Sequence, residues 1–128
     1  PPLGGGFFLR KNKMISFLAV FSGGGIGSVL RWLCCSLIPS HWGIMFVNVV
    51  GALLIGCAYS YFAKSNLSAE AKMFVMTGLL GGFTTFSTYL LNFITLLNEN
   101  KIVEGFAYLI TSVLVGSLFL LAGIRLAS

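Results

Sequence analysis

Charged residues divide the chain into long apolar stretches. They cluster at residues 10–13, 64–72 and 99–104, and the stretches 73–98 and 105–124 contain none. Between Met14 and Ala63 the only charged residue is Arg31. Each apolar stretch is at least about 20 residues long, enough at about 1.5 Å per residue to cross a hydrocarbon core of roughly 30 Å. The pattern predicts four transmembrane helices, at about residues 14–38, 43–63, 71–97 and 103–126.

The connections between these helices are short, so neighbouring helices should pack antiparallel and leave both termini on one side. Pro39–Gly43 separates the first two helices as a turn with an interfacial tryptophan. Composition supports lipid burial: 57% of the 128 residues are hydrophobic and 9% are charged, whereas soluble domains keep roughly a quarter of their residues charged. We therefore expect an all-α membrane protein.

The segment 1–13 differs from the four-helix unit at 14–128. It is loop-like and does not begin with methionine, and Met14 is a natural start. We expect it to be disordered, either a leader or a cloning remainder. Its basic residues follow its few apolar ones, unlike a signal peptide. Cytoplasmic loops are enriched in Lys and Arg, so we expect a cytoplasmic N-terminus. The bases on the terminal side are Arg10, Lys11, Lys13, Lys64, Lys72 and Arg125, against Lys101 on the other.

The third predicted helix carries the densest polar group. Residues 77–89 contain three glycines followed by five hydroxyl residues, a poor composition for an uninterrupted membrane helix. Irregular backbone is tolerated at membrane depth only where protein or enclosed water satisfies it. We expect a helix break whose freed carbonyl oxygens point inward, where, converging near a symmetry axis, they would suit a small hard cation such as Na⁺. The alternative is a plain packing contact at Gly78 and Gly82.

Phe86 and Tyr89 are three residues apart and should share one helix face. An aromatic ring has a positive edge, so rings presented edge-on could hold a small anion weakly enough to release it. The alternative is that both are ordinary core or lipid-facing aromatics. Asn48, the sole amide of the second helix, offers two N–H donors to an anion or an interhelical hydrogen bond.

The fourth and first helices add further candidates. Tyr108, Ser112 and Gly116 recur every fourth residue and form one polar stripe. Its hydroxyls could donate to an anion or to a neighbouring helix. The glycine-rich run 23–28, with Gly23 and Gly27, predicts close helix packing. Arg31 either extends to the membrane interface or attracts anions into a vestibule.

The sequence lacks the parts of an enzyme site. Its three glutamates lie outside the predicted spans or at their ends, it has no aspartate, and His41 is in a turn. General acid–base and nucleophilic mechanisms therefore lack their side chains. Cys34, Cys35 and Cys57 have no metal-ligand spacing with His41 and fit packing roles.

These residues resemble the Fluc (CrcB) family of fluoride channels, from about Met14 to the C-terminus. The most specific match is the run from Gly78 to Thr88, with its glycines and its Thr-Thr-Phe-Ser-Thr sequence. The other helices match, in order, at Gly23 to Trp32, at Asn48 with Gly51 and Gly56, and at Tyr108 with Ser112 and Gly116.

The resemblance implies a plasma-membrane (cell inner membrane) channel that exports fluoride passively and confers fluoride resistance. It implies an antiparallel, dual-topology dimer with two pores and a structural Na⁺ held by the backbone carbonyls of Gly81 and Thr84. The implied anion path is lined by Asn48, Phe86, Ser87, Thr88, Tyr89, Tyr108 and Ser112.

Three departures qualify the resemblance. Tyr89 stands where the family usually has a second phenylalanine, Asn92 replaces a common glutamate, and Ile44 replaces a common threonine. The pore at Tyr89 could be impaired, and the biased charges suggest pairing with a homologous chain of opposite orientation. The alternatives are a non-conducting subunit of a heteromeric channel and a small four-helix multidrug exporter, which needs a membrane-embedded carboxylate.

Overall fold

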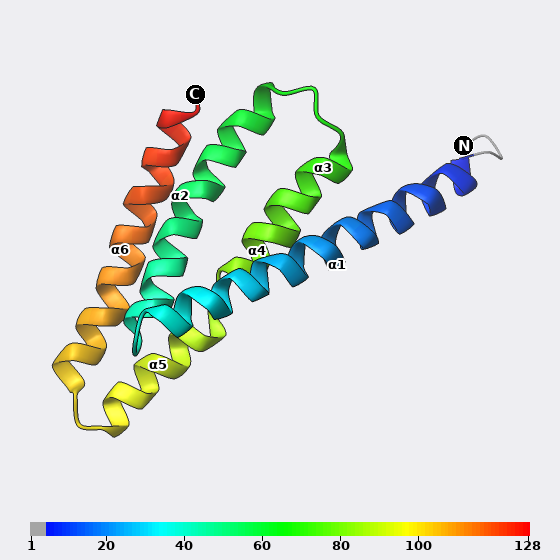
Figure 1. Cartoon of the computed structure of the whole chain (residues 1–128). Helices are drawn as coiled ribbons and strands as arrows, with labels where there is room; N and C mark the ends of the chain where they lie inside the picture. Colours follow the sequence, from blue (N-terminus) through cyan, green and yellow to red (C-terminus); the bar gives the residue numbers. More distant parts are fainter. Residues whose placement is uncertain (1–4) are drawn as a thin grey trace.

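The structure is a computed structural model that describes the backbone of residues 5–128 and the side chains from Lys13 onward. Four segments are long and apolar enough to cross a membrane, the third of them in several pieces (Figure 1). In chain order the elements are α1 (Gly5–Leu37), α2 (Trp42–Lys64), α3 (Ala69–Met73), the π-helix η1 (Phe74–Leu80), α4 (Gly81–Phe83), α5 (Ser87–Asn98) and α6 (Ile102–Leu126).

The all-helical fold with four spans is confirmed, and all four spans, the first of them at Lys13–Leu37, match the predicted ranges to within a few residues. The first helix is longer than its span, because α1 begins at Gly5 and not near Met14. The part of the segment 1–13 from Gly5 onward is therefore helical, where we expected disorder. Residues 1–4 lie outside the described part of the chain, and the role of the whole segment stays a prediction.

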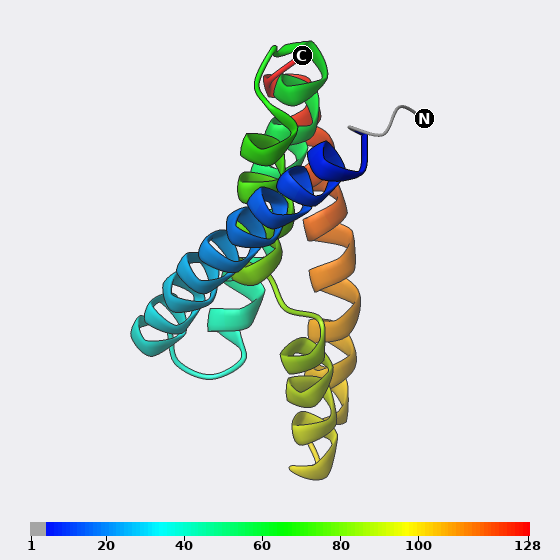
Figure 2. The ribbon, with the colours of Figure 1, turned by 90° about the vertical axis from the view of Figure 1, so that its right-hand side faces the viewer.

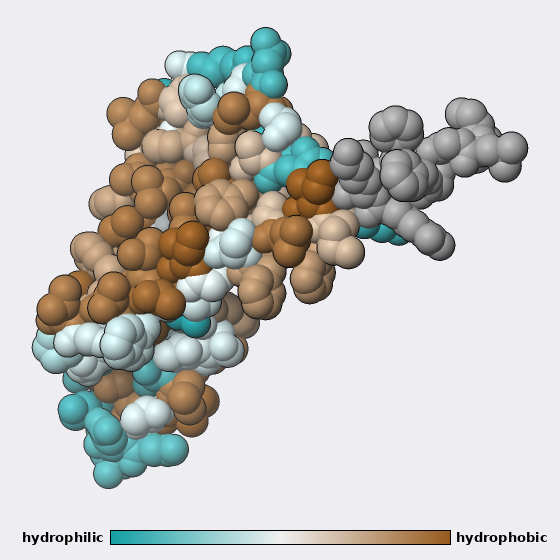
Figure 3. All heavy atoms as spheres, turned by 45° about the vertical axis from the view of Figure 1, so that its right-hand side comes forward, coloured by the Kyte–Doolittle hydropathy of each residue, from teal (hydrophilic) through white to brown (hydrophobic). Residues whose placement is uncertain are grey.

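The surface of the chain is that of a multi-pass membrane protein. Apolar residues form a broad band between two polar ends (Figure 3). Large side chains such as Phe21, Trp32, Leu91 and Val113 are more than half exposed in the band. Among the described side chains only a small core is buried, with Val47 at its centre. Lipid or a second protein chain must cover the remaining apolar surface.

The helices form two packing units, which the third span joins. In one unit α1 crosses the first half of the third span, η1 and α4, and in the other α2 runs along α6 with α5 beside them (Figures 1 and 2). The amino end of α1, the α2–α3 connection and the carboxyl terminus lie toward one end of the molecule, and the α1–α2 and α5–α6 turns lie toward the other (Figure 1). This is the antiparallel order expected from the short connections.

Glycines allow the close approach within the first unit. A Cβ atom on Gly23 would lie 2.5 Å from the Phe74 carbonyl oxygen, and one on Gly82 would lie 2.6 Å from that of Gly24. Gly27 and Gly78 are similarly enclosed by the facing backbone. No side chain fits at these four positions without moving α1 away from the third span.

Two further glycine contacts join α2 to α6. Gly56 faces the Leu120 carbonyl and Gly123 faces the Leu53 carbonyl, each too closely for a Cβ. This reciprocal pair was not singled out from the sequence, although Gly56 belongs to the run that resembles the family. Gly116, expected as a packing glycine, differs: an added Cβ would meet nothing within 4 Å. In a single chain no described residue packs against this position.

Candidate ion pathway at the break in the third span

The third span breaks at residues 84–86, directly after its glycines. Helix α4 ends at Phe83, Thr84 is extended (φ −87°, ψ 156°), and α5 begins at Ser87. Hydroxyl groups add hydrogen bonds at this point: Thr84 Oγ1 donates to the Leu80 carbonyl at 3.1 Å, alongside the Thr84 amide, and Thr85 Oγ1 accepts from the Thr88 amide at 3.4 Å. Threonine and serine can cap helix ends in this way, so the cluster of hydroxyl residues supports both ends of the break.

The backbone ahead of the break is also irregular. Residues Phe74–Leu80 form a π-helix, in which each turn is wider than in an α-helix and carbonyls are offset from their usual donors. The π-helical segment includes Gly78, at the crossing with α1. Such segments are often found at functional sites.

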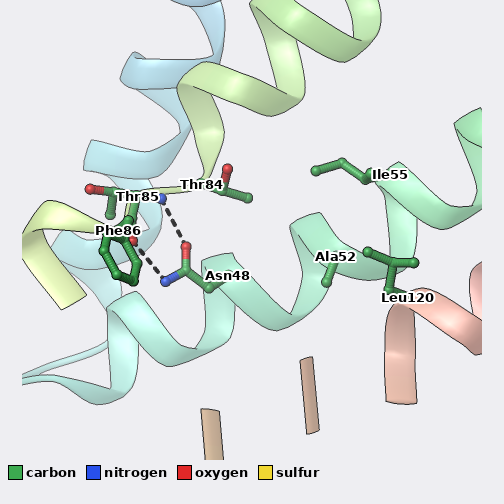
Figure 4. Close-up of a pocket in the computed structure, with 7 residues that line it drawn as sticks. All are labelled: Asn48, Ala52, Ile55, Thr84, Thr85, Phe86 and Leu120. Atoms are coloured by element: carbon green, nitrogen blue, oxygen red, sulfur yellow. Dashed lines mark hydrogen bonds between the residues drawn. The ribbon is translucent and has the colours of Figure 1, made fainter. Parts of the chain in front are cut away.

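Asn48 holds the break from the side of α2. Its Nδ2 atom donates to the Thr85 carbonyl oxygen at 2.9 Å, and its Oδ1 atom accepts from the Thr85 amide at 2.9 Å (Figure 4). One side chain thereby satisfies both backbone groups of a residue that lies outside any helix. This is the interhelical hydrogen bond considered from the sequence, and it leaves the second N–H of the amide available as a donor.

Arg31 holds the break from the side of α1. Its Nη1 atom donates to the Thr84 carbonyl oxygen at 3.1 Å, and the side chain is half-buried. This contact is a structural one, and the vestibule role considered from the sequence stays a prediction. The guanidinium satisfies a backbone carbonyl that has lost its helical partner.

The two carbonyls expected to hold a cation differ in their surroundings. The Thr85 amide, which in an α-helix would donate to the Gly81 carbonyl, donates to Asn48 instead. Gly81 is exposed, and its oxygen has lost this α-helical donor. The Thr84 oxygen has a second lone pair beyond the one that accepts from Arg31. Neutral carbonyl oxygens are suitable donors for a hard cation, although the Arg31 charge at Thr84 opposes one.

Phe86 and Tyr89 lie together, as their spacing predicted, with ring centroids 6.0 Å apart, but their surroundings differ. Phe86 is 71% exposed and Tyr89 is 5% exposed. Phe86 borders a hollow of about 270 Å³ together with Asn48, Thr84 and Thr85 (Figure 4). Tyr89 donates its hydroxyl hydrogen to the Leu109 carbonyl, so this hydroxyl, absent from phenylalanine, points toward α6.

Tyr89 connects the break to the polar stripe of α6. Its ring lies 5.3 Å from the ring of Tyr108, which is buried. The Asn92 amide donates to the Tyr108 hydroxyl at 3.3 Å. One turn further along α6, the buried Ser112 hydroxyl has no hydrogen-bond partner among the described residues. From the sequence, Asn92 was noted only as a departure from the family. A polar side chain inside a membrane span needs a hydrogen-bond partner, and this need could have indicated the contact with Tyr108.

The remaining candidates lie around this core. Ser87 is exposed at the start of α5, Thr88 is half-buried, and Gly51 lies against the Thr84 side chain. The three cysteines are free thiols. Within the described part of the chain, no group of three or more His, Cys, Asp or Glu side chains could hold a metal ion.

The chain is similar to known proteins over most of its length. Residues 18–124 match the family model described as CrcB-like protein, Camphor Resistance (CrcB). The protein named fluoride-specific ion channel FluC from Rhizobium meliloti (strain 1021) is 40% identical over 120 residues, which cover 88% of this chain and 96% of that protein. The protein of the same name from Aquifex aeolicus (strain VF5) is 39% identical over 112 residues, covering 82% and 90%.

Proposed function

The chain belongs to the CrcB family, and from this premise we propose that it forms a channel that conducts fluoride across the membrane. The family is one of ion channels, so the chain is not an enzyme. The observation that carries the proposal is the break at residues 84–86, where backbone, amide and aromatic groups meet at an open hollow on the surface of the chain, which Ala52, Ile55 and Leu120 also line. Export is passive: a negative interior drives an anion outward with about 2.3 kcal/mol per charge per 100 mV.

The chemistry of the hollow suits a small anion held weakly. Asn48 has one N–H that it does not use within the chain, and Phe86 presents a largely exposed ring with a positive edge. At the break, the positive charge of Arg31 is directed to the Thr84 carbonyl. Conduction needs sites that bind and release quickly. The partial positive charges at the hollow allow an anion to bind and leave quickly, whereas an unpaired Lys or Arg side chain would hold it more tightly.

The polar stripe of α6 extends the path. Tyr108 and Ser112 present hydroxyls, and the Ser112 hydroxyl lacks a partner within the described chain. A passing anion could accept a hydrogen bond from it. Ser87 and Thr88 contribute hydroxyls at the other side of the break. Tyr89 supports the path by packing between Phe86 and Tyr108.

We further propose that two chains assemble antiparallel in the plasma membrane around a structural Na⁺. One chain supplies two carbonyl oxygens, from Gly81 and Thr84, and a hard cation requires more donors than two. A second copy would supply the rest, and the open space at Gly116 and the exposed Gly81 are available to it. The ion would balance the dipoles of the converging carbonyls. The biased charges favour a cytoplasmic N-terminus for the chain in its preferred orientation.

The function is tested by ion efflux from liposomes that contain the purified chain alone. We expect rapid fluoride efflux when a potassium ionophore removes the opposing potential, and no comparable efflux from chloride-loaded liposomes. Absence of fluoride efflux from the chain alone, with efflux restored by co-expression of a homologous chain, would support the non-conducting subunit. Absence of efflux in both preparations would contradict the channel proposal.

The role of Na⁺ is tested by its removal. In N-methylglucamine chloride instead of sodium chloride, we expect the dimer fraction measured by light scattering to fall and fluoride efflux to fall with it, because the converging carbonyls lose their cation. Returning Na⁺ should restore both. If the dimer fraction and the efflux rate are the same in the two salts, the proposal of a structural Na⁺ is wrong.

The multidrug exporter is disfavoured by the positions of the acidic residues. Proton-coupled exchange requires a carboxylate within the membrane. Glu70 and Glu104 lie in the first turns of α3 and α6, and Glu99 follows α5. All three therefore lie at the ends of the spans.

A further inference from the structure

His41 lies in the turn between α1 and α2, outside the ion path described above, and is almost fully buried. It is 6% exposed. Its Nδ1 atom lies 3.0 Å from the Ser40 hydroxyl, and its Nε2 atom lies 3.5 Å from Glu104 Oε1 at the start of α6. Ser40 has a left-handed backbone (φ 64°), which is uncommon for a residue with a side chain. The turn thus has an unusual conformation where it places these groups together.

The His41 ring also contacts Tyr108, an aromatic residue of the proposed ion path. Its centroid lies 4.8 Å from that of Tyr108 with an interplanar angle of 77°, an edge-to-face arrangement. Glu104 lies one helical turn before Tyr108 on the same face of α6. His41 Nε2 is buried and makes no hydrogen bond among the described residues. Its 3.5 Å approach to Glu104 therefore places a possible ion pair between the turn that precedes α2 and the end of α6 that carries Tyr108.

Water can reach this site. His41 borders a polar hollow of about 230 Å³ with Ser40, Asn92, Thr95 and Glu99. Asn92, in the wall of this hollow, donates to the Tyr108 hydroxyl. A proton from solution can thus reach the imidazole although the ring is buried.

The charged and titratable groups around His41 determine the effect of that proton. Glu104 and Tyr108 face the ring from α6. Glu99 borders the same hollow at the end of α5. Cys35, in α1, packs against the buried core that contains Tyr108. Glu99 itself lies 3.5 Å from Lys101, and among the described residues Glu104 is the carboxylate that approaches the ring without a pairing base. A carboxylate is an acceptor only, and a protonated imidazole can donate to Glu104 and Ser40 at the same time.

We propose that His41 is a positioning residue for the ion path, and that its protonation strengthens the His41–Glu104 contact and keeps Tyr108 in place. The ion pair is stronger than a hydrogen bond from a neutral ring. Protonation gives the imidazole a positive charge, so the contact tightens as pH falls. The inference rests on the proposed fluoride path, and it predicts faster fluoride passage at lower pH.

The first test is fluoride efflux with the same pH inside and outside, corrected for liposomes without protein because hydrogen fluoride crosses lipid. Between pH 8 and pH 5.5 we expect the rate to rise about three- to tenfold. His41→Gln, which keeps polarity but cannot become charged, and Glu104→Gln should flatten the profile. Glu99→Gln is the matched control and should keep it. A pH dependence retained in His41→Gln would overturn the proposal.

The second test does not depend on conduction. Trp42 lies beside His41, with ring centroids 4.6 Å apart, and Trp32→Phe leaves it as the sole tryptophan. Because a protonated imidazole quenches a neighbouring indole, we expect fluorescence to fall as pH falls, and this change to vanish with His41→Gln. A smaller change with Glu104→Gln supports the contact, and an identical change contradicts it. A chain without fluoride efflux at any pH would contradict the proposed function, while this titration would still test the contact.

Discussion

Asn48→Ala is expected to reduce fluoride efflux at least about tenfold and to loosen the break in the third span. The substitution removes both hydrogen bonds to Thr85, at 2.9 Å each. A buried backbone group left without a partner costs about 1–3 kcal/mol, and about 1.4 kcal/mol in a barrier changes a rate tenfold. Efflux from liposomes measures the first effect. Hydrogen exchange of residues 84–87 measures the second, and it should become faster.

The control for this prediction is Ser22→Ala. Ser22 also donates to a backbone carbonyl, that of Leu18 at 2.7 Å, but within its own helix and at an exposed position. Its removal should change neither measurement. If Asn48→Ala abolishes efflux and leaves hydrogen exchange unchanged, the amide acts on the ion and not on the backbone. If efflux is unchanged, Asn48 is not part of the path.

Phe86→Ala is expected to abolish most of the fluoride efflux while leaving the fold intact. The ring is 71% exposed and contributes little to the core of one chain, yet it borders the hollow beside Asn48. Loss of its positive edge removes a weak anion site and widens the path to water. Efflux should fall at least about tenfold, which corresponds to about 1.4 kcal/mol in the barrier.

Two variants separate the possible reasons for that loss. Phe21→Ala removes a ring of equal exposure, 71%, from α1, and its efflux should match that of the unchanged chain. Phe86→Leu keeps apolar bulk but lacks the aromatic edge, and it should be nearly as impaired as Phe86→Ala. Full activity of Phe86→Leu would show that bulk suffices. Full activity of Phe86→Ala would place the ion path elsewhere.

The sequence predicted the spans and the presence of a break for a clear physical reason. Charges cannot remain in lipid, so their positions mark the ends of spans, and the composition of residues 77–89 is unsuitable for a continuous helix. It did not predict the π-helix at Phe74–Leu80. The glycine-rich run 23–28 predicted close packing of the first helix, but no local pattern in residues 74–80 indicates a π-helix.

The partners of individual side chains could not be predicted from the sequence either. Arg31 and the Thr84 carbonyl are 53 positions apart, and two plausible local roles for the arginine hid this third one. Gly56 and Gly123 show their function only when α2 and α6 are placed together. Tyr89 is the reverse case: its spacing from Phe86 predicted their proximity, but its burial depends on Tyr108.

The division of the third span between two packing units constrains the biogenesis of the protein. Helix α5 has 12 residues, about 18 Å of helix, too short to span roughly 30 Å of hydrocarbon by itself. The translocon must therefore recognise residues 69–98 as one continuous segment. The peptide groups of Thr84 and Thr85 at the break gain hydrogen-bond partners only when Arg31 and Asn48, from the two earlier spans, pack against them. Synthesis order favours this sequence of events, because both partners precede the third span in the chain.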